Sequence, residues 1–414
     1  MNSSGRDALG IYVSFPFCRS KCTYCNFASG VYPAADHAPY VDRLIEDLSG
    51  AGAWAAAIGV DLPRRADSVY LGGGTPSLLE PDLLARLFAS IRAEFDLDTD
   101  AEITMECAPG QLSGATLEAL VAAGVNRVSL GVQSFVDSEA HASGRLHDRA
   151  AVEADLRRLR AAGIANLSVD LIAGLAGQTF ASWEESLSAL IDSGVSHASI
   201  YMLEVDEDSR LGREVLNHGA RYRADLVPSD DTIAQMYERA LERLEAAGLS
   251  QAGLHQYEIS NFARPGFESR HNLRYWQRRP YLGIGLDASS MAFVVNGTKG
   301  HAGLPDVLRS TTTDDLKQYL AGPAAPETTW LSTARQHEEA WFLALRMNEG
   351  VNVDALRQEF GPEPVAQAME TVARLVNDGL LTDDGARVRL TARGRLLSND
   401  VFQEFLEPTA ATTA

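Results

Sequence analysis

The chain has 414 residues, of which 45% are hydrophobic and 22% charged, and its formal net charge is −20. The length predicts one large domain and a smaller one, and the composition is that of a globular protein, which excludes a wholly disordered or fibrous chain. The acidic charge argues against non-specific binding to nucleic acid or to an anionic membrane surface, and no apolar run reaches the ~18 residues of a membrane-spanning helix.

Short β-rich runs alternate with amphipathic helical stretches along most of the chain. The predicted strands are Ile11–Phe15, Ser68–Leu71, Glu102–Glu106, Arg127–Gly131, Leu167–Ile172 and Ala198–Leu203. The predicted helices are Tyr40–Ile58, Pro81–Glu94, Gly114–Ala123, Asp148–Ala162 and Ser182–Ser193. Several helices end in Gly just before an apolar strand, which is typical of βα crossovers in a parallel sheet. We therefore predict a partial (β/α) barrel of about six strands, or a doubly wound sheet, with its site at the C-terminal strand ends.

The pattern changes after residue 300. Gly, Pro and Thr cluster in residues 301–331, so we predict a linker there between a barrel at 8–300 and a small helical domain at 332–406. The predicted elements of the small domain are two helices (about 334–347 and 363–377), a hairpin (380–382 and 388–390) and a last helix. This order resembles a winged helix. The domain has 8 Arg and Lys residues against 12 Asp and Glu, so we do not expect it to bind DNA.

Three of the four cysteines, Cys18, Cys22 and Cys25, lie within eight residues just after the first predicted strand. The N-terminal residues lack a basic-then-apolar signal, so we expect a cytoplasmic protein, and in a reducing compartment such a cluster indicates metal binding. Three thiolates in one loop can hold three irons of a 4Fe–4S cluster and leave the fourth iron open to an exchangeable ligand. The alternatives are a structural zinc site, for which no fourth Cys or His lies nearby, and unrelated buried thiols. We expect Cys107 to be a core thiol.

With Tyr24 before the last cysteine, the C-x3-C-x2-C spacing resembles the signature of radical S-adenosylmethionine (SAM) proteins. The resemblance implies that the amino and carboxylate groups of SAM chelate the open iron, and that reduction cleaves SAM to a 5′-deoxyadenosyl radical. The run Gly72-Gly73-Gly74-Thr75-Pro76 after the second strand is similar to the family's glycine motif, which contacts the methionyl amine. By itself, this run is equally typical of a tight turn.

Polar residues follow at the ends of successive strands, and any one of them alone is typical of an isolated polar group in a barrel. Together they supply two carboxylates, an amide and a guanidinium to one place, as a polar cofactor requires. The resemblance implies that Arg145 pairs with the SAM carboxylate, that Glu106, Gln133 and Asp170 hold amine and ribose groups, and that Tyr12 lies near the adenosine. The predicted SAM-binding residues are Tyr12, Tyr24, Gly74, Thr75, Glu106, Gln133, Arg145 and Asp170.

Further motifs are similar to one branch of the family, which contains oxygen-independent coproporphyrinogen III oxidase and the HemW heme chaperones. They are Gly131–Phe135, Tyr257–Ala263 and Leu390–Gly394, so the resemblance covers nearly the whole chain. Two features favour the chaperones. The oxidase has a further cysteine two residues after the third, where this chain has Phe27. The run His271-Asn272-Leu273-Arg274-Tyr275-Trp276 matches the H-N-x-x-Y-W motif associated with heme binding in the chaperones.

The H-N-x-x-Y-W segment also suits heme chemically. His271 can supply an axial nitrogen to iron, and Tyr275 and Trp276 offer flat apolar area to a macrocycle. Residues 264–279 contain five Arg and one Glu, which would provide charge-assisted donors to propionate groups. Without the motif, an Arg-rich loop is typical of a solvated surface, and a single His is typical of a structural residue.

This chain departs from the family pattern at several positions. Ser14 replaces the usual His before the cluster, Asn26 replaces the usual Asp after it, and Ser289 replaces a second His. Ala176 stands in place of a usual Pro. The two lost histidines remove possible proton donors and heme ligands, so these changes bear on turnover chemistry more than on cluster binding.

We therefore predict a heme chaperone that carries a 4Fe–4S cluster and SAM, uses a reductant and passes heme to an acceptor protein that the sequence does not identify. The sequence leaves open whether SAM is consumed and whether the protein is an enzyme. The first alternative is an oxidase that abstracts hydrogen from the propionates of coproporphyrinogen III, with the cofactor supplying the radical step. The second is a radical SAM enzyme that acts on another substrate and binds neither heme nor coproporphyrinogen.

Overall fold

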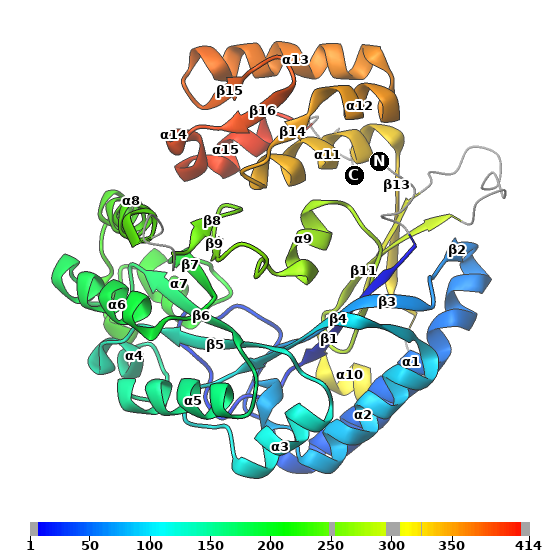
Figure 1. Ribbon diagram of the computed structural model, residues 1–414, viewed down its shortest axis with the longest axis vertical. Coiled ribbons are helices and arrows are strands. Elements are labelled where there is room, and N and C mark those ends of the chain that lie inside the picture. Colours follow the sequence, from blue (N-terminus) through cyan, green and yellow to red (C-terminus); the bar gives the residue numbers. More distant parts are fainter. Residues whose placement is uncertain (1–6, 248–252, 295–306, 324, 407–414) are drawn as a thin grey trace.

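The computed structural model describes residues 7–247, 253–294, 307–323 and 325–406. Its larger part is a curved sheet with helices on the outer face (Figure 1). Seven strands run parallel in the spatial order β10 (Tyr281–Ile284), β1 (Leu9–Phe15), β3 (Arg65–Gly73), β4 (Asp96–Cys107), β5 (Arg127–Gln133), β6 (Asn166–Ala173) and β7 (His197–Met202). Within the described ranges the sheet does not close, so the α/β fold is a partial barrel.

Antiparallel strands extend both edges of the parallel sheet. Beyond β10 lie β11 (Ser289–Val294), β12 (Val307–Thr311) and β13 (Glu327–Leu331), with β2 (Val60–Asp61) paired to β11. Beyond β7 lie β9 (Asn261–Ala263) and β8 (His255–Gln256). The described part of 301–331 is therefore not the predicted linker, since it contributes two strands and the helix α10 (Leu316–Leu320). Gly322 and Pro323 lie in the turn between α10 and β13, whereas Thr311, Thr328 and Thr329 are part of the strands β12 and β13.

The six predicted strands are confirmed as β1 and β3 to β7. The helices of the larger part are α1 (His37–Ile58), α2 (Pro81–Glu94), α3 (Gly114–Ala122), α4 (Asp137–Ala142), α5 (Arg149–Ala161), α6 (Phe180–Ser193), α7 (Arg210–Leu216), α8 (Asp230–Ala247) and α9 (Arg270–Trp276), with 3-10 turns at Ala34–Asp36, Pro76–Leu78 and Arg221–Leu226. Gly124, Gly163 and Gly194 follow α3, α5 and α6 with φ of 80°, 90° and 63°, the left-handed values expected of glycine caps.

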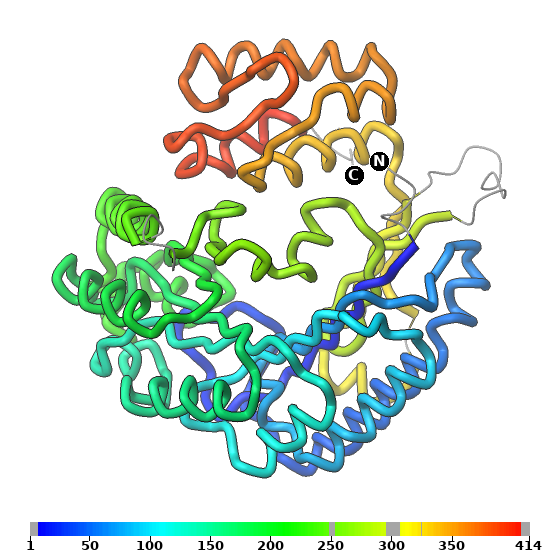
Figure 2. Tube along the Cα trace, in the orientation of Figure 1, coloured from blue at the N-terminus to red at the C-terminus, as the bar shows by residue number. Residues whose placement is uncertain are grey.

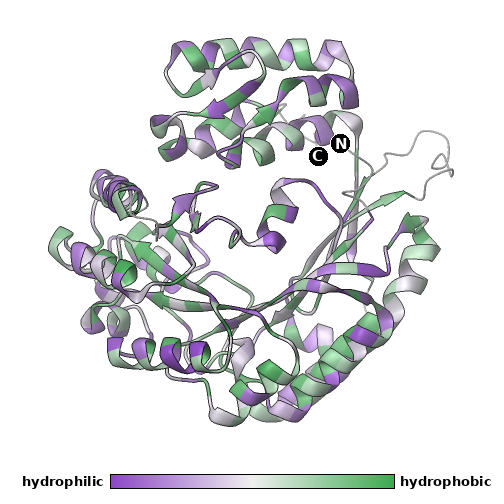
Figure 3. Ribbon diagram, in the orientation of Figure 1, coloured by the Kyte–Doolittle hydropathy of each residue, from purple (hydrophilic) through white to green (hydrophobic). Residues whose placement is uncertain are grey.

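The core lies between the sheet and the outer helices. Strand β1 is buried along nearly its whole length, as expected for a parallel strand covered on both faces. Helix α2 buries Leu84, Leu87, Phe88 and Ile91, one stripe of an amphipathic helix, and the outer helices show this alternation of hydrophobic and hydrophilic residues (Figure 3). No helix in the described ranges is both long enough and apolar enough to cross a membrane.

The C-terminal unit has a second hydrophobic core, which contains Trp341, Val365 and Val388. Its elements are α11 (Thr333–Arg346), β14 (Val351–Asn352), α12 (Val353–Phe360), α13 (Pro362–Asn377), β15 (Leu381–Asp383), β16 (Arg387–Leu390), α14 (Ala392–Leu396) and α15 (Ser398–Gln403). The two predicted helices and the hairpin are present, and α12 and β14 are additional. The chain trace carries this unit across the open side of the curved sheet, with α9, β8 and β9 between them (Figure 2).

Candidate cofactor site

A cavity of about 510 Å³ opens where the parallel strands end. This volume falls within the range of roughly 300–1,000 Å³ that is typical of small-molecule sites. The predicted cluster and SAM residues that line it are Cys18, Cys22, Tyr24, Cys25, Gly74, Thr75, Glu106, Gln133, Arg145 and Asp170. Residues from the ends of β3, β4, β5 and β6, together with Arg145 and the cysteine loop, therefore meet at one place.

The cysteine loop follows β1 and is fixed by backbone hydrogen bonds. The Cys18 N–H donates to the Gly30 carbonyl at 2.8 Å, and the Thr23 N–H donates to the Ser143 carbonyl at 2.9 Å. All three cysteines are free thiols and half-buried. Burial raises the pKa of the Cys18 thiol, against hydrogen bonds from Thr75 and Ser29 that lower it.

The arrangement of the three thiols bears on the zinc alternative. In the described part of the chain, no three Cys, His, Asp or Glu side chains gather closely enough to hold one metal ion. The ligands of a 4Fe–4S cluster do not have to surround one metal ion, because each thiolate binds a different iron. Three thiolates in one loop fit a 4Fe–4S cluster, to which they would supply ligands for three of the four irons.

The glycines at the strand ends make room for neighbouring parts of the protein. A Cβ on Gly74 would lie 2.8 Å from the carbonyl oxygens of Phe15 and Phe17, so this glycine lets the β3 loop pack against the cysteine loop. A Cβ on Gly131 would lie 2.7 Å from Nη2 of Arg145. Both glycines thus help to assemble the wall of the cavity.

Two carboxylates enter the cavity from β4 and β6. Glu106 accepts from the Tyr70 hydroxyl at 2.8 Å and from the Gly73 N–H at 3.2 Å, and withdrawal from water raises its pKa to about 7. Asp170 accepts from the Ser129 hydroxyl at 3.1 Å, and its pKa is also raised by burial. Burial favours the neutral form of both carboxyls, and a cationic ligand beside them would favour the ionised form.

Two cavity residues, Gln133 and Arg145, each have one buried side-chain atom without a hydrogen-bond partner in the protein. Gln133 has a left-handed backbone with φ 69°, and its buried Oε1 has no hydrogen bond. Arg145 donates from Nη2 to the Tyr24 hydroxyl at 3.2 Å, while its buried Nε has no partner. An unpaired acceptor and an unpaired cationic donor beside the cysteine loop fit the amine and carboxylate of SAM, because buried polar groups are costly when unsatisfied.

Tyr12 is the one predicted SAM residue that does not line this cavity. It lies in the barrel interior, where its ring centroid is 6.0 Å from that of Tyr70 and 6.3 Å from that of His271. Tyr12 and its neighbour Val13 point to opposite faces of β1. The Tyr12 side chain lies on the face toward Tyr70 and His271, in the interior and not at the mouth.

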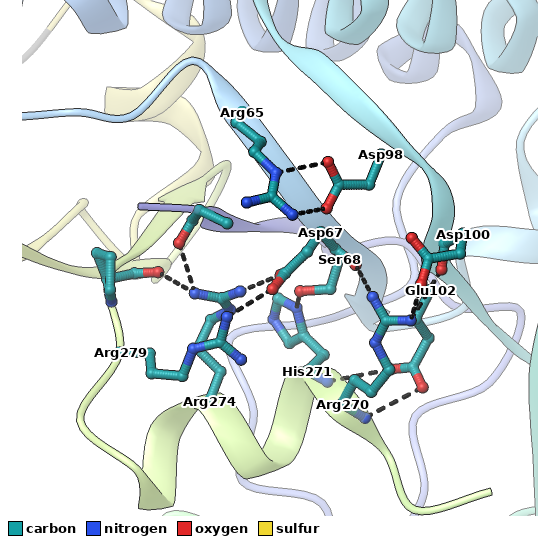
Figure 4. A network of polar contacts seen from close by, with 12 residues as sticks. Arg65, Asp67, Ser68, Asp98, Asp100, Glu102, Arg270, His271, Arg274 and Arg279 are labelled. Atoms are coloured by element: carbon teal, nitrogen blue, oxygen red, sulfur yellow. Dashed lines mark hydrogen bonds and ion pairs between the residues drawn. The ribbon is translucent and has the colours of Figure 1, made fainter. Parts of the chain in front are cut away.

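The predicted heme segment forms α9 and is held against β3 and β4 by polar contacts (Figure 4). His271 is 1% exposed. Its Nδ1 lies 3.0 Å from the Ser68 hydroxyl and its Nε2 lies 2.8 Å from the Tyr275 hydroxyl, so both ring nitrogens are engaged. The backbone N–H of His271 donates to the Glu102 carboxylate at 3.0 Å. Burial lowers the pKa of the imidazole to about 3, which keeps it neutral.

The arginines of this segment are paired with protein groups. Arg274 is fully buried and forms an ion pair with Asp67, and Arg279 pairs with the same carboxylate at 2.6 Å (Figure 4). Arg278 pairs with Glu359 of α12 at 2.8 Å. These guanidinium groups hold α9 to β3 and to the C-terminal unit rather than forming a free basic surface.

Several cavity residues were not predicted. Ser129 lies two residues before Gly131 on β5, so strand periodicity alone would have placed it on the same face. Tyr201, Ser260 and Arg346 also line the cavity. Arg346 comes from the C-terminal unit, some 170 residues after the last predicted SAM residue, and no local sequence signal links it to the site.

The fold and the two matched regions define the class of protein. Residues 12–190 match the radical SAM superfamily, and residues 331–397 match the HemN C-terminal domain. The structure of coproporphyrinogen III oxidase (HemN) from Escherichia coli, a radical SAM enzyme, is similar to the chain with a TM-score of 0.77. The match has 23% identity and covers 97% of this chain and 90% of the other, so it establishes the fold.

Curated relatives narrow the class. The heme chaperones HemW of Lactococcus lactis and Bacillus subtilis are both 32% identical to this chain over 95% of its length and over 96% and 98% of theirs. The radical S-adenosyl methionine domain-containing protein 1, mitochondrial, of Bos taurus is also 32% identical, over 97% of this chain and 88% of its own. The chain belongs to the radical SAM superfamily and, within it, to the HemW family. Membership in the superfamily implies a 4Fe–4S cluster and SAM, which, when bound, would supply the chemistry of a reductively generated carbon radical.

Proposed function

We propose that this protein is a heme chaperone that binds heme and passes it to an acceptor protein while carrying a 4Fe–4S cluster and SAM. The observation that carries the proposal is the 32% identity to heme chaperones over 95% of the chain. The reduced cytoplasm is the proposed location, since the three loop cysteines are free thiols suited to holding a cluster.

The residue after Asn26 supports a chaperone over an oxidase. At the position where the oxidase has a further cysteine, Phe27 lines the cavity with 64% of its surface exposed. An exposed ring beside the cavity mouth offers apolar area to a flat macrocycle and no thiol chemistry.

The proposed role of His271, Tyr275 and Trp276 as heme contacts requires a change in α9. His271 can ligate iron only after one of its bonds to Ser68 and Tyr275 breaks. The neutral imidazole is the form that binds metal, so its low pKa suits this role once the ring nitrogen is released.

Two assays on the anaerobically reconstituted protein test the function. With SAM, a strong reductant and coproporphyrinogen III, we expect no vinyl-bearing product. With heme, we expect a saturable change in the heme absorbance, followed by transfer to apomyoglobin used as a general acceptor. Multiple turnovers of coproporphyrinogen would identify an oxidase, and neither product nor heme binding would identify a radical SAM enzyme with another substrate.

A further inference from the structure

The cavity contains a second cationic group that the SAM site does not use. Arg346 is the last residue of α11 and lines the cavity together with Tyr201 and Ser260. Arg145 lies against β5 and the cysteine loop, whereas Arg346 lies beside the segment that leads into β9. Strands β6 and β7 separate these two places in the sheet. The two guanidinium groups therefore mark different sides of one cavity.

The backbone fixes the position of Arg346. Its carbonyl accepts from the Ile259 N–H at 3.1 Å, and the Asn348 N–H donates to the Tyr257 carbonyl at 3.0 Å. Glu258 and Met347 form a β-bridge between the same two segments. The C-terminal unit is thus joined to the barrel at the point where it delivers this side chain.

The guanidinium of Arg346 is oriented but not saturated. Its Nη2 forms an ion pair with Oε2 of the fully buried Glu258 at 3.5 Å, a long contact, and the other oxygen of Glu258 accepts from the Ser260 N–H and the Asn261 amide. Its buried Nε has no partner. A planar fork with free donors is the preferred partner of a carboxylate.

Trp276 supports the other face of Arg346. The guanidinium carbon lies 4.3 Å from the centre of the indole ring, a cation–π contact. Trp276 does not line the cavity in the described structure, but Arg346, which it contacts, does. The last residue of the H-N-x-x-Y-W motif therefore reaches the cavity through this arginine.

We propose that Arg346 binds a carboxylate arm of the macrocycle at the side of the cavity opposite Arg145, and that Trp276 is its positioning residue. The proposal rests on the proposed heme function, and it names the group of the ligand that is recognised, a propionate. Arg145 remains the partner of the SAM carboxylate. The C-terminal unit thereby takes part in ligand selection.

The test compares heme with its dimethyl ester, in which both propionates are capped, on the reconstituted protein with SAM bound. We expect the wild type to bind heme at least ~10-fold more tightly than the ester, the size expected of one charge-assisted hydrogen bond. Arg346→Gln should bind both forms equally, and Arg346→Lys should recover part of the preference. Trp276→Leu should reduce the preference more than Trp276→Phe, which keeps a ring under the guanidinium.

Two controls separate the possible failures. Arg357→Gln removes the same charge from an exposed pair with Asp354 on α12 and should keep the full preference for heme. SAM affinity and iron content should be unchanged in Arg346→Gln. If the wild type binds heme and the ester equally, or if Arg346→Gln keeps the preference, the carboxylate subsite is wrong while heme binding stands. If the wild type binds neither form, the proposed function and this subsite both fail.

Discussion

The cavity at the strand ends and the α9 segment carry the two sets of residues predicted to bind cofactors, and the charged and ring groups of these two sets are paired with the protein to different degrees. In the cavity, the buried Oε1 of Gln133 and Nε of Arg145 have no partner. In α9, the ring nitrogens of His271 and the Nη atoms of Arg274 are bonded to protein groups, while Nε of Arg274 and Nε1 of Trp276 are buried without a partner. The unpaired atoms in the cavity suit a ligand, whereas the bonded side chains of α9 stabilise the fold.

The difference teaches how to interpret a motif. The spacing of residues in a motif predicts that they bind a ligand. Their hydrogen-bond partners in the structure show whether the side chains are free to contact that ligand. The paired polar groups of α9 hold the helix to β3 and β4, and Trp276 contacts Arg346, which lines the cavity. Substitutions in the cavity should therefore weaken ligand binding, and substitutions of the paired groups in α9 should lower the stability of the fold.

The largest expected effect is loss of the cluster. Cys25→Ala removes one of three thiolate ligands, and we expect the reconstituted protein to lose the visible absorption of the cluster. Cys107→Ala is the matched control, because this buried thiol also lines the cavity and its pKa is raised to about 12 by burial. A full cluster in Cys25→Ala, or its loss in Cys107→Ala, would show that the ligand set is misassigned.

The second expected effect is on folding. His271→Ala leaves the hydroxyls of Ser68 and Tyr275 without their partner and creates a cavity in the core. We expect the free energy of unfolding to fall by about 2–4 kcal/mol, measured by denaturant titration. His255→Ala, on the exposed side of β8, should change it by less than ~0.5 kcal/mol. An unchanged stability together with a shifted heme spectrum would mean that His271 serves the ligand and not the fold.

The sequence predicted the part of the molecule that local patterns encode. The six parallel strands, the glycine caps and the residues at the strand ends follow from periodicity and from the geometry of a parallel sheet. The burial of His271 and Arg274 was not predictable, since their partners Ser68 and Asp67 lie about 200 residues earlier in the chain. Arg346 was missed for the same reason, and the edge strands β12 and β13 were missed because they are short and flanked by turn residues.

The third expected effect is on SAM binding. Arg145→Ala removes the guanidinium whose Nε is unpaired in the cavity, and we expect SAM affinity to fall by roughly 10- to 100-fold. Iron content should stay intact, because Arg145 contacts Tyr24 and not a cysteine by hydrogen bond. Arg149→Ala, which removes an exposed pair with Glu153 four residues along, should leave SAM affinity unchanged. Equal affinities in both variants would remove Arg145 from the site.

The smallest expected effect is a proton released when SAM binds. The pKa of Glu106 is about 7 in the protein, so this carboxyl is mostly protonated at pH 6 and ionised at pH 9. A cationic ligand favours the ionised form and lowers the pKa. Binding at pH 6 should therefore release close to one proton from Glu106, and binding at pH 9 should release almost none.

Calorimetry of SAM binding in two buffers with different ionisation enthalpies measures this release on the oxidised cluster, without turnover. Glu106→Gln is the control: it cannot ionise, so the difference between the two proteins gives the proton release that depends on the Glu106 carboxyl, including its effect on the bound amine of SAM. Because Glu106 also accepts from Tyr70 and Gly73, glutamine can still accept one of those bonds and keep the wall of the cavity in place. If wild type and Glu106→Gln release the same number of protons at pH 6, then Glu106 does not contact the cation. Its raised pKa then reflects burial alone, just as burial alters the pKa of His271 in α9.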